Sequence, residues 1–313
     1  MKRTILALAL LLLAAPRASA ADKLTLILDW FVNPDHAPII VAAQKGYFAE
    51  QNLDVEIIPP ADPSDPPKLV AAGKMDLAVY YQPSLQIAVS KGLPLARIAT
   101  VIATPLDSLM VMQDGPVKAI KDLKGKRIGH SLGSTEEAIL GTILQRHGLT
   151  LKDVEVVNVN FALSSALLSG KVDAVIGAYR NFEMNQIEIE GQGRKARAFY
   201  VEEEGVPVYD ELIVVAHKDK LRDPRFKRFV AALEKGALYL TNNPEESWKL
   251  FVARHKDLND ELNRRAWRDT LPRFDKRPAA MDKGRYERFA RFLKERGLVK
   301  ELPPLEQYAV ELP

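Results

Sequence analysis

The sequence predicts an α/β protein of two similar lobes followed by a helical C-terminal region. Three observations carry this prediction. Segments typical of strands and helices alternate along the chain, one helix–turn–strand pattern occurs twice, and the chain becomes almost wholly helical after Asp223. Such alternation is typical of a mostly parallel sheet with helices on its faces.

The first lobe is predicted from residue 21 to residue 113. Its apolar and polar residues alternate in the strand segments, whereas apolar residues recur at three-to-four spacing in the helical ones. The predicted strands are Lys23–Leu28, Asp54–Ile58, Leu77–Tyr80 and Ala96–Thr104, and the predicted helices are Pro38–Glu50, Pro67–Ala72 and Pro83–Ser90.

The second lobe is predicted over residues 114–210, because Asp114-Gly115-Pro116 is typical of a linker and the rhythm restarts after it. Residues 211–313 should return to the first lobe through a strand at Glu211–Ala216. The elements predicted within the second lobe are the strands Arg127–His130, Val154–Val159 and Ala174–Ala178 and the helices Glu136–His147 and Ser164–Leu168.

The repeated pattern indicates where a ligand would bind. Residues 69–79 and 167–176 both read as a helix, a Gly-Lys turn, an aspartate and a buried strand, and aromatic and amide residues follow each strand. Ligands of open α/β sheets bind at the carboxyl ends of strands. Two such edges facing each other would form a cleft; coincidence in a generic turn is the alternative.

Residues 1–20 are predicted to be a signal peptide outside the fold. Lys2 and Arg3 precede an apolar stretch of 11 residues, which is too short to span a bilayer. Residues 18–20, Ala-Ser-Ala, form a cleavage site, so the mature chain should begin near Ala21. An uncleaved anchor is the alternative. The chain has no cysteine, which excludes a lipoprotein anchor, disulfides and thiolate metal sites.

Composition limits the classes of partner. The chain has 313 residues, of which 47% are hydrophobic and 27% charged, which is typical of a globular protein with a sizeable core. Without residues 1–20 it carries 41 basic and 41 acidic residues. This neutral balance gives no support for nucleic-acid binding, which needs a basic surface.

Several segments together resemble a known family. They include Leu28-Asp29-Trp30-Phe31-Val32-Asn33-Pro34-Asp35-His36, Gly46-Tyr47-Phe48, Asp122-Leu123-Lys124-Gly125-Lys126 and Gly205-Val206-Pro207-Val208-Tyr209-Asp210-Glu211. With them the chain resembles the periplasmic substrate-binding proteins of ABC importers, and more narrowly the ThiY-type proteins that deliver pyrimidine precursors of thiamine. The Asp-Trp-x-x-Asn-x-x-His segment is the most specific of these matches.

The resemblance implies a periplasmic-binding-protein type II fold, with two Rossmann-like lobes and a hinge of two crossovers near Asp114 and Glu211. It also implies a periplasmic, monomeric protein that presents a small heteroaromatic ligand to an inner-membrane ABC permease with its ATPase. Related pyrimidine synthases use a cysteine-rich iron-binding motif. This chain has no cysteine, which favours transport over synthesis.

Trp30, Asn33 and His36 follow the first predicted strand and are candidate ligand contacts. A flat heteroaromatic ligand needs a ring to stack on and a few polar groups that fix its orientation. Trp30 supplies the ring, whereas Asn33 and His36 donate or accept hydrogen bonds. The alternatives are a packed tryptophan and a helix-capping asparagine.

The two repeated edges supply further candidates, Tyr81 and Gln82 in the first lobe and Tyr179 and Asn181 in the second. Tyr80 and Tyr81 should point to opposite faces of the strand, and Tyr81 is the one expected in the cleft. The alternative is that these aromatic residues only seal the sheet.

Residues 129–133 match the G-x-S-x-G pattern of serine hydrolases, with Ser131 as the nucleophile and Asp173 and His217 as partners. Asp173, however, precedes its strand, whereas the acidic residue of a hydrolase triad should follow a strand. The favoured interpretation is a ligand-binding turn in which Ser134 opens a capping box and the helix start points free amides into the cleft.

Tyr209 and Glu211 complete the candidate set at the predicted return crossing. A carboxylate there could accept hydrogen bonds from an exocyclic amino group of a pyrimidine. The five histidines show no metal-ligand spacing, so neither a metal nor a cofactor is predicted, and no catalysis. The alternative ligands are riboflavin, an aromatic acid, nitrate and a sulfonate; the alternative classes are a serine hydrolase and a pyrimidine synthase.

Overall fold

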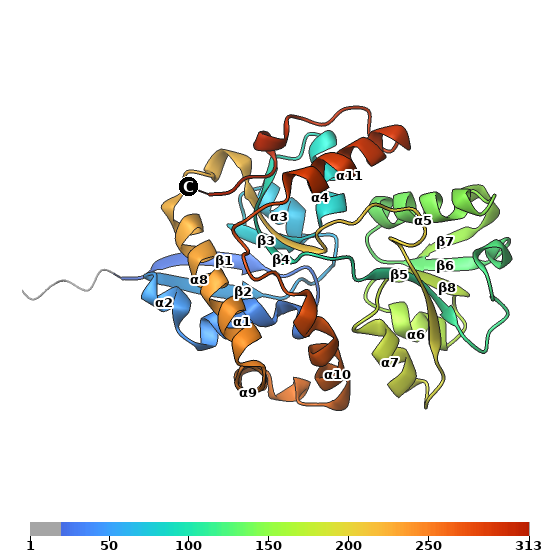
Figure 1. Ribbon diagram of the computed structural model, residues 1–313, viewed down its shortest axis with the longest axis horizontal. Helices are drawn as coiled ribbons and strands as arrows, with labels where there is room; N and C mark the ends of the chain where they lie inside the picture. The colour runs from blue at the N-terminus through green and yellow to red at the C-terminus, as the bar shows by residue number, and fades with distance from the viewer. Residues whose placement is uncertain (1–19, 313) are drawn as a thin grey trace, which may run out of the picture.

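A computed structural model describes residues 20–312 and shows two α/β lobes side by side (Figure 1). The first lobe contains a five-stranded sheet. In spatial order its strands are β2 (Leu53–Ile58), β1 (Asp22–Ile27), β3 (Leu77–Tyr80), β10 (Leu212–His217) and β4 (Leu95–Ile102). β1 pairs in parallel with β2 and β3, whereas β10 is antiparallel to both of its neighbours.

The second lobe repeats this arrangement. Its strands are, in spatial order, β7 (Glu155–Asn158), β6 (Arg127–His130), β8 (Ala174–Tyr179), β5 (Asp107–Met112) and β9 (Ala196–Tyr200). Again the first three strands are parallel to one another, and the fourth, β5, is antiparallel to both of its neighbours, β8 and β9. The predicted two-lobed α/β architecture is therefore confirmed.

The repeated sequence pattern occupies the same place in both sheets. β3 and β8 are the third strands of their sheets, and each follows the Gly-Lys turn and aspartate. Asp76 accepts the backbone N–H of Thr25 on β1 at 3.0 Å, and Asp173 accepts that of Arg127 on β6 at 2.9 Å. Each aspartate thus ties the turn before its own strand to the neighbouring parallel strand.

The outward crossover differs from the prediction. β5 begins at Asp107 and already pairs with β8, so the chain leaves the first lobe over residues 103–106 and not at Asp114. Asp114 lies just after β5, where its carboxylate pairs with Arg194 at 2.9 Å inside the second lobe. The return path runs from β9 to β10, which begins at Leu212.

Helices cover the sheets of both lobes. The first lobe carries α1 (Ala37–Gln44), α2 (Tyr47–Glu50), α3 (Pro66–Ala71), α4 (Gln82–Ser90), α8 (Pro224–Asn242) and α9 (Pro244–Arg254), and the second carries α5 (Ser134–Arg146), α6 (Leu163–Leu168) and α7 (Glu183–Glu190). The predicted helix 38–50 is divided at Gly46, whose φ of 73° is left-handed and ends α1.

The last two helices lie next to both lobes. α10 (Glu261–Thr270) packs on α7 of the second lobe, and α11 (Lys283–Glu295) packs on α4 of the first (Figure 1). Phe289 and Phe292 of α11 join the buried apolar cluster of the second lobe. These helices therefore brace the two lobes on either side of the cleft.

Of the predicted signal peptide, residues 1–20, the first 19 lie outside the described residues. Within residues 20–312, no helix is both long and apolar enough to cross a membrane.

Candidate ligand-binding cleft

A cavity of about 640 Å³, counted with its mouth, lies between the lobes at the ends of the strands. Ligand pockets typically have volumes of this order. Its lining includes five aromatic side chains and six carboxyl groups: Trp30, Tyr81, Tyr179, Phe182 and Tyr209, with Asp29, Asp35, Asp107, Glu136, Glu183 and Glu211. No lysine or arginine lines it among the described residues.

Seven of the eleven candidate residues from the sequence line this cavity. They are Trp30, Asn33, Tyr81, Ser131, Tyr179, Tyr209 and Glu211. Both repeated edges therefore contribute to one space, as the sequence predicts, and Tyr81 is the tyrosine of its pair that faces it. Whether each residue contacts the ligand stays a prediction.

Trp30 reaches across the cleft from the first lobe. Its ring lies 4.5 Å from that of Phe161 in an edge-to-face arrangement, and its side chain joins a buried cluster of second-lobe residues. The indole Nε1 is buried without a hydrogen-bond partner. Trp30 therefore offers a ring face and a free N–H donor in the closed cleft.

His36 supports the cavity wall from behind. Its Nδ1 accepts the backbone N–H of Asn33 at 3.3 Å, so Nε2 carries the proton and donates to Asp29 Oδ1 at 2.9 Å. Tyr81 donates its hydroxyl to Asp29 Oδ2 at 2.8 Å. His36 was predicted to contact the ligand. In the structure it holds Asp29 in position instead.

Gln82 lies at the hinge and not in the cavity. Its Oε1 accepts the backbone N–H of Asp210 at 2.8 Å, and the side chain is fully buried. It ties the start of α4 to the return crossover, because the backbone N–H of Gln82 also bonds the carbonyl of Asp210.

Ser134 does not cap its helix toward the cleft. The N-cap of α5 is Gly133, and Ser134 is exposed, with Lys91 Nζ at 3.5 Å from its hydroxyl. The backbone N–H groups of Ser131 and Leu132 donate instead to Glu136 at 2.7 and 2.8 Å. The backbone N–H groups that were predicted to bind a polar or anionic ligand group therefore bind the carboxylate of Glu136, in the first turn of α5.

Asn181 closes the cleft instead of lining it. Its Nδ2 donates to Asp35 Oδ1 at 2.6 Å and to Thr270 at 2.7 Å, which joins the second lobe to the loop after β1 and to α10. Ser84 and Thr135 make a second bond between the lobes at 3.1 Å. The structure is therefore the closed form of the cleft.

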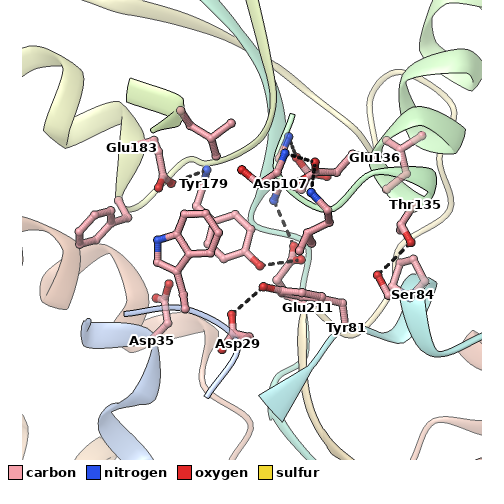
Figure 2. Close-up of a pocket in the computed structure, with 18 of the residues that line it drawn as sticks. Asp29, Asp35, Tyr81, Ser84, Asp107, Thr135, Glu136, Tyr179, Glu183 and Glu211 are labelled. Atoms are coloured by element: carbon pink, nitrogen blue, oxygen red, sulfur yellow. Dashed lines mark hydrogen bonds between the residues drawn. The ribbon is translucent and has the colours of Figure 1, made fainter. Parts of the chain in front are cut away.

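Glu211 ties both crossovers to the second lobe. Its Oε2 accepts the backbone N–H groups of Leu106 and Asp107 at 2.5 and 3.1 Å. Its Oε1 accepts the Tyr179 hydroxyl at 3.1 Å (Figure 2). The residue is 3% exposed. Glu211 therefore both faces the cavity and holds the two hinge segments together.

Glu136 is packed against Gly177 on β8. Gly177 has a φ of 87° at a bulge, where Ile176 and Gly177 together lie opposite Leu109. A Cβ at this position would lie 1.9 Å from Glu136 Oε1. The Gly177 N–H donates to Asp107 Oδ1 at 2.9 Å, so this glycine orders two cavity carboxyl groups.

Burial makes these carboxyl groups hard to ionise. It raises the pKa of Asp35 to about 6, that of Glu136 to about 7 and that of Glu183 to about 8. Burial also raises the pKa of Glu211 to about 7, although the N–H groups of Leu106 and Asp107 oppose this. The pKa of Asp107 rises well above its usual range through burial and the nearby Glu211 and Glu136 charges.

Sequence reasoning missed five of the six carboxyl groups. Asp29 and Asp35 lay inside a segment already chosen for Trp30, Asn33 and His36, and Asp107 begins a strand that was not predicted. Glu136 and Glu183 resemble ordinary acids of a helix first turn. Glu136 and Glu183 share one signal: each follows a strand of the second lobe, and its carboxylate accepts backbone N–H groups at the end of that strand.

The serine hydrolase alternative fails on geometry. Ser131 donates its hydroxyl to the carbonyl of Asn160 at 2.5 Å. Asp173 stands before β8, at the end away from the cavity, and His217 ends β10 and bonds the N–H of Asp219. The three residues therefore form no triad. Within residues 20–312, no group of three or more His, Cys, Asp or Glu side chains could hold a metal ion.

Solved structures share this fold. The alkanesulfonate-binding protein of Xanthomonas axonopodis pv. citri superimposes with a TM-score of 0.70 at 16% identity, covering 94% of this chain and 98% of that one. A Candida albicans protein described as having the generic periplasmic binding protein fold gives 0.70 at 18% identity, covering 93% and 96%. At these identities the likeness establishes the fold alone, and it confirms the predicted class.

Curated relatives are more similar in sequence. A Haemophilus influenzae protein whose name assigns it to thiamine biosynthesis is 50% identical over 94% of this chain and 93% of its own length. The formylaminopyrimidine-binding protein of Halalkalibacterium halodurans is 32% identical over 82% and 80%. A 4-amino-5-hydroxymethyl-2-methylpyrimidine phosphate synthase of Legionella pneumophila is 27% identical over 91% and 90%.

The family model described as NMT1/THI5 like matches residues 33–247, which include both crossovers and all of the cavity lining except Asp29 and Trp30. With the relatives and the shared fold, this match identifies the chain as a member of the NMT1/THI5-like family.

Proposed function

We propose that this protein is the solute-binding component of an ABC importer and that it captures a pyrimidine precursor of thiamine between its lobes. The observation that carries the proposal is the lining of the cavity, which combines aromatic rings with carboxyl groups and has no basic side chain among the described residues. The 32% identical relative named as a formylaminopyrimidine-binding protein supports the same ligand class.

The cavity suits an aminopyrimidine chemically. A flat ring can lie against Trp30 or Tyr179, since aromatic faces favour stacked or edge-to-face partners. The exocyclic amino group is a donor of two hydrogen bonds, and carboxylate oxygens such as those of Glu211 accept them. The free Nε1 of Trp30 can donate to a ring nitrogen or to a formyl or hydroxyl oxygen.

The alternative ligands fit this lining less well. A sulfonate, nitrate or aromatic acid would place its negative charge among six carboxyl groups without a compensating cation. Riboflavin needs room for three fused rings and a ribityl chain, whereas direct contacts such as Ser84–Thr135 and Asn181–Asp35 already join the lobes around the cavity.

The importer partners follow from this role. We infer that the protein works as a monomer in the periplasm, after cleavage near Ala20/Ala21, and presents its ligand to an inner-membrane permease with an ATPase. N-terminal sequencing of the exported chain tests this, because a first residue far from Ala21 would contradict the predicted cleavage. A role in binding without catalysis is supported by the relative named as a formylaminopyrimidine-binding protein, whereas the 27% identical relative of Legionella pneumophila is named as a synthase.

Calorimetric titration of the ligand-free protein tests the proposed function. We expect 4-amino-5-hydroxymethyl-2-methylpyrimidine or its formylamino precursor to bind with a Kd of about 1 μM or tighter, equivalent to about 8 kcal/mol. Riboflavin and ethanesulfonate should give no heat of binding. Tight binding of the sulfonate with none of either pyrimidine would contradict the proposal.

A further inference from the structure

The closed cleft brings together carboxyl groups that the open protein would keep apart. Asp29, Asp35 and Glu211 belong to the first lobe and its crossover, and Asp107, Glu136 and Glu183 belong to the second. Figure 2 shows the six side chains around one space. Buried like charges repel strongly in a medium of low dielectric constant, so this set needs protons or a cation.

The charged groups nearby do not supply that cation. Arg180 forms a bidentate ion pair with Glu202, with both N–O distances at 2.7 Å. His130 accepts the backbone N–H of Gly133 on its Nδ1. His36 donates its one N–H to Asp29, and its other ring nitrogen accepts the N–H of Asn33. The titratable and charged groups that face the cluster are His36, Tyr81, His130, Tyr179, Arg180 and Tyr209 from neighbouring elements, and Glu137 from the same helix as Glu136.

A second observation points to a ligand with a proton to donate. Asp35 is 1% exposed. Its Oδ1 accepts hydrogen bonds from Asn181 and Thr270, whereas its Oδ2 has no hydrogen-bond partner. Asp35 lines the cavity, and its carboxyl group points toward that space in Figure 2. An unpaired carboxylate oxygen in such a place is costly unless a donor fills it.

We propose that the cleft binds its pyrimidine as a cation, with a proton on a ring nitrogen that pairs with the carboxylates the two lobes bring together. An aminopyrimidine is a weak base, so its ring takes up this proton from solvent as the lobes close. The proposal rests on the proposed function, since it specifies the form in which that ligand is bound.

The burial of the carboxyl groups agrees with this geometry. Burial raises the pKa of Glu136 and Glu211 to about 7, so the closed cleft takes up a proton that the open cleft, in which water reaches the same groups, does not need. In the proposal this proton sits on the ligand ring, and the resulting cation lowers the pKa of the carboxyl groups beside it, which stay ionised. The closed, loaded state therefore contains more protons than the open protein and free ligand. Such a difference weakens binding as the pH rises, by about tenfold per pH unit for each proton taken up.

Two measurements on the full mature protein test the proposal with 4-amino-5-hydroxymethyl-2-methylpyrimidine. Calorimetry in buffers of different ionisation enthalpy should report the uptake of about one proton per ligand between pH 7 and 8, with affinity falling about tenfold. ¹⁵N NMR of the labelled ligand should show a protonated ring nitrogen in the complex at pH 8, where the free ligand is neutral.

A neutral ring in the bound state would overturn the proposal, as would an affinity that is independent of pH. Either result, obtained with a ligand that binds tightly, would leave the proposed function intact. Failure of the pyrimidine to bind at any pH would instead refute the proposed function itself.

A matched pair of variants separates the cavity charge from surface charge. Glu136→Gln removes a cavity carboxylate but keeps an oxygen for the N–H groups of Ser131 and Leu132. Glu137→Gln removes the same charge one residue away, where the side chain is 44% exposed and outside the cavity. We expect the first to weaken binding at least tenfold and the second to leave it unchanged; equal effects would contradict the proposal.

Discussion

Replacing Gly177 with alanine is expected to weaken ligand binding by roughly 100-fold or more while the protein stays folded. The new methyl group would lie 1.9 Å from Glu136 Oε1, so the carboxylate must leave the N–H groups of Ser131 and Leu132. Each buried donor left without a partner costs about 1–3 kcal/mol. The displaced side chain also enters the cavity, so affinity should fall by roughly 100-fold or more, as measured by calorimetry.

Gly193→Ala is the matched control. Gly193 has a φ of 89°, close to the 87° of Gly177, and an added Cβ there meets open space. Both variants carry the same backbone cost of about 1–2 kcal/mol, which thermal unfolding measures. Only Gly177→Ala should lose affinity for the ligand. A Gly177→Ala protein that binds normally would show that Glu136 has no fixed place in the site.

Replacing Trp30 with alanine is expected to weaken binding by about 1–3 kcal/mol, or roughly 5- to 150-fold. The variant loses the ring face and the free Nε1 in the cavity, and it also loses the contact with Phe161 that helps to close the cleft. Calorimetry gives the affinity, and thermal unfolding reports any loss of stability.

Trp248→Ala provides the comparison for this change. Trp248 is buried to a similar degree, but it packs on Phe251 and Trp267, away from the cavity. This variant should lose stability and keep its affinity for the ligand. If Trp30→Ala behaves in the same way, Trp30 is a packing residue and the ligand does not lie against it.

The parts of the fold that follow from local patterns could be predicted from the sequence. The repeated Gly-Lys-x-Asp segments correctly placed β3 and β8 in equivalent positions, because each combines a turn, a capping aspartate and a buried strand. The outward crossover could not be found in this way. β5 is buried along its whole length and shows no alternation, and the turn signal at Asp114-Gly115-Pro116 is stronger than that of residues 103–106.

The residues of the site were likewise predictable only where a local pattern marks them. Aromatic residues at strand ends were predictable, because strand ends meet at one edge of a sheet. Five of the six carboxyl groups were not, since their burial depends on the opposite lobe, which no local pattern reports. His36 and Asn181 show the same limit: both were expected to touch ligand, but each found a carboxylate partner, Asp29 and Asp35, that only the folded chain brings near.

The most direct test of the central claim is mass spectrometry of the small molecule that the protein releases on denaturation. The protein should be purified without refolding from the periplasm of cells that are dependent on an external source of the thiamine pyrimidine. The account expects an aminopyrimidine, hydroxymethyl or formylamino in type, at close to one molecule per chain. A flavin or a sulfonate at that stoichiometry would contradict it.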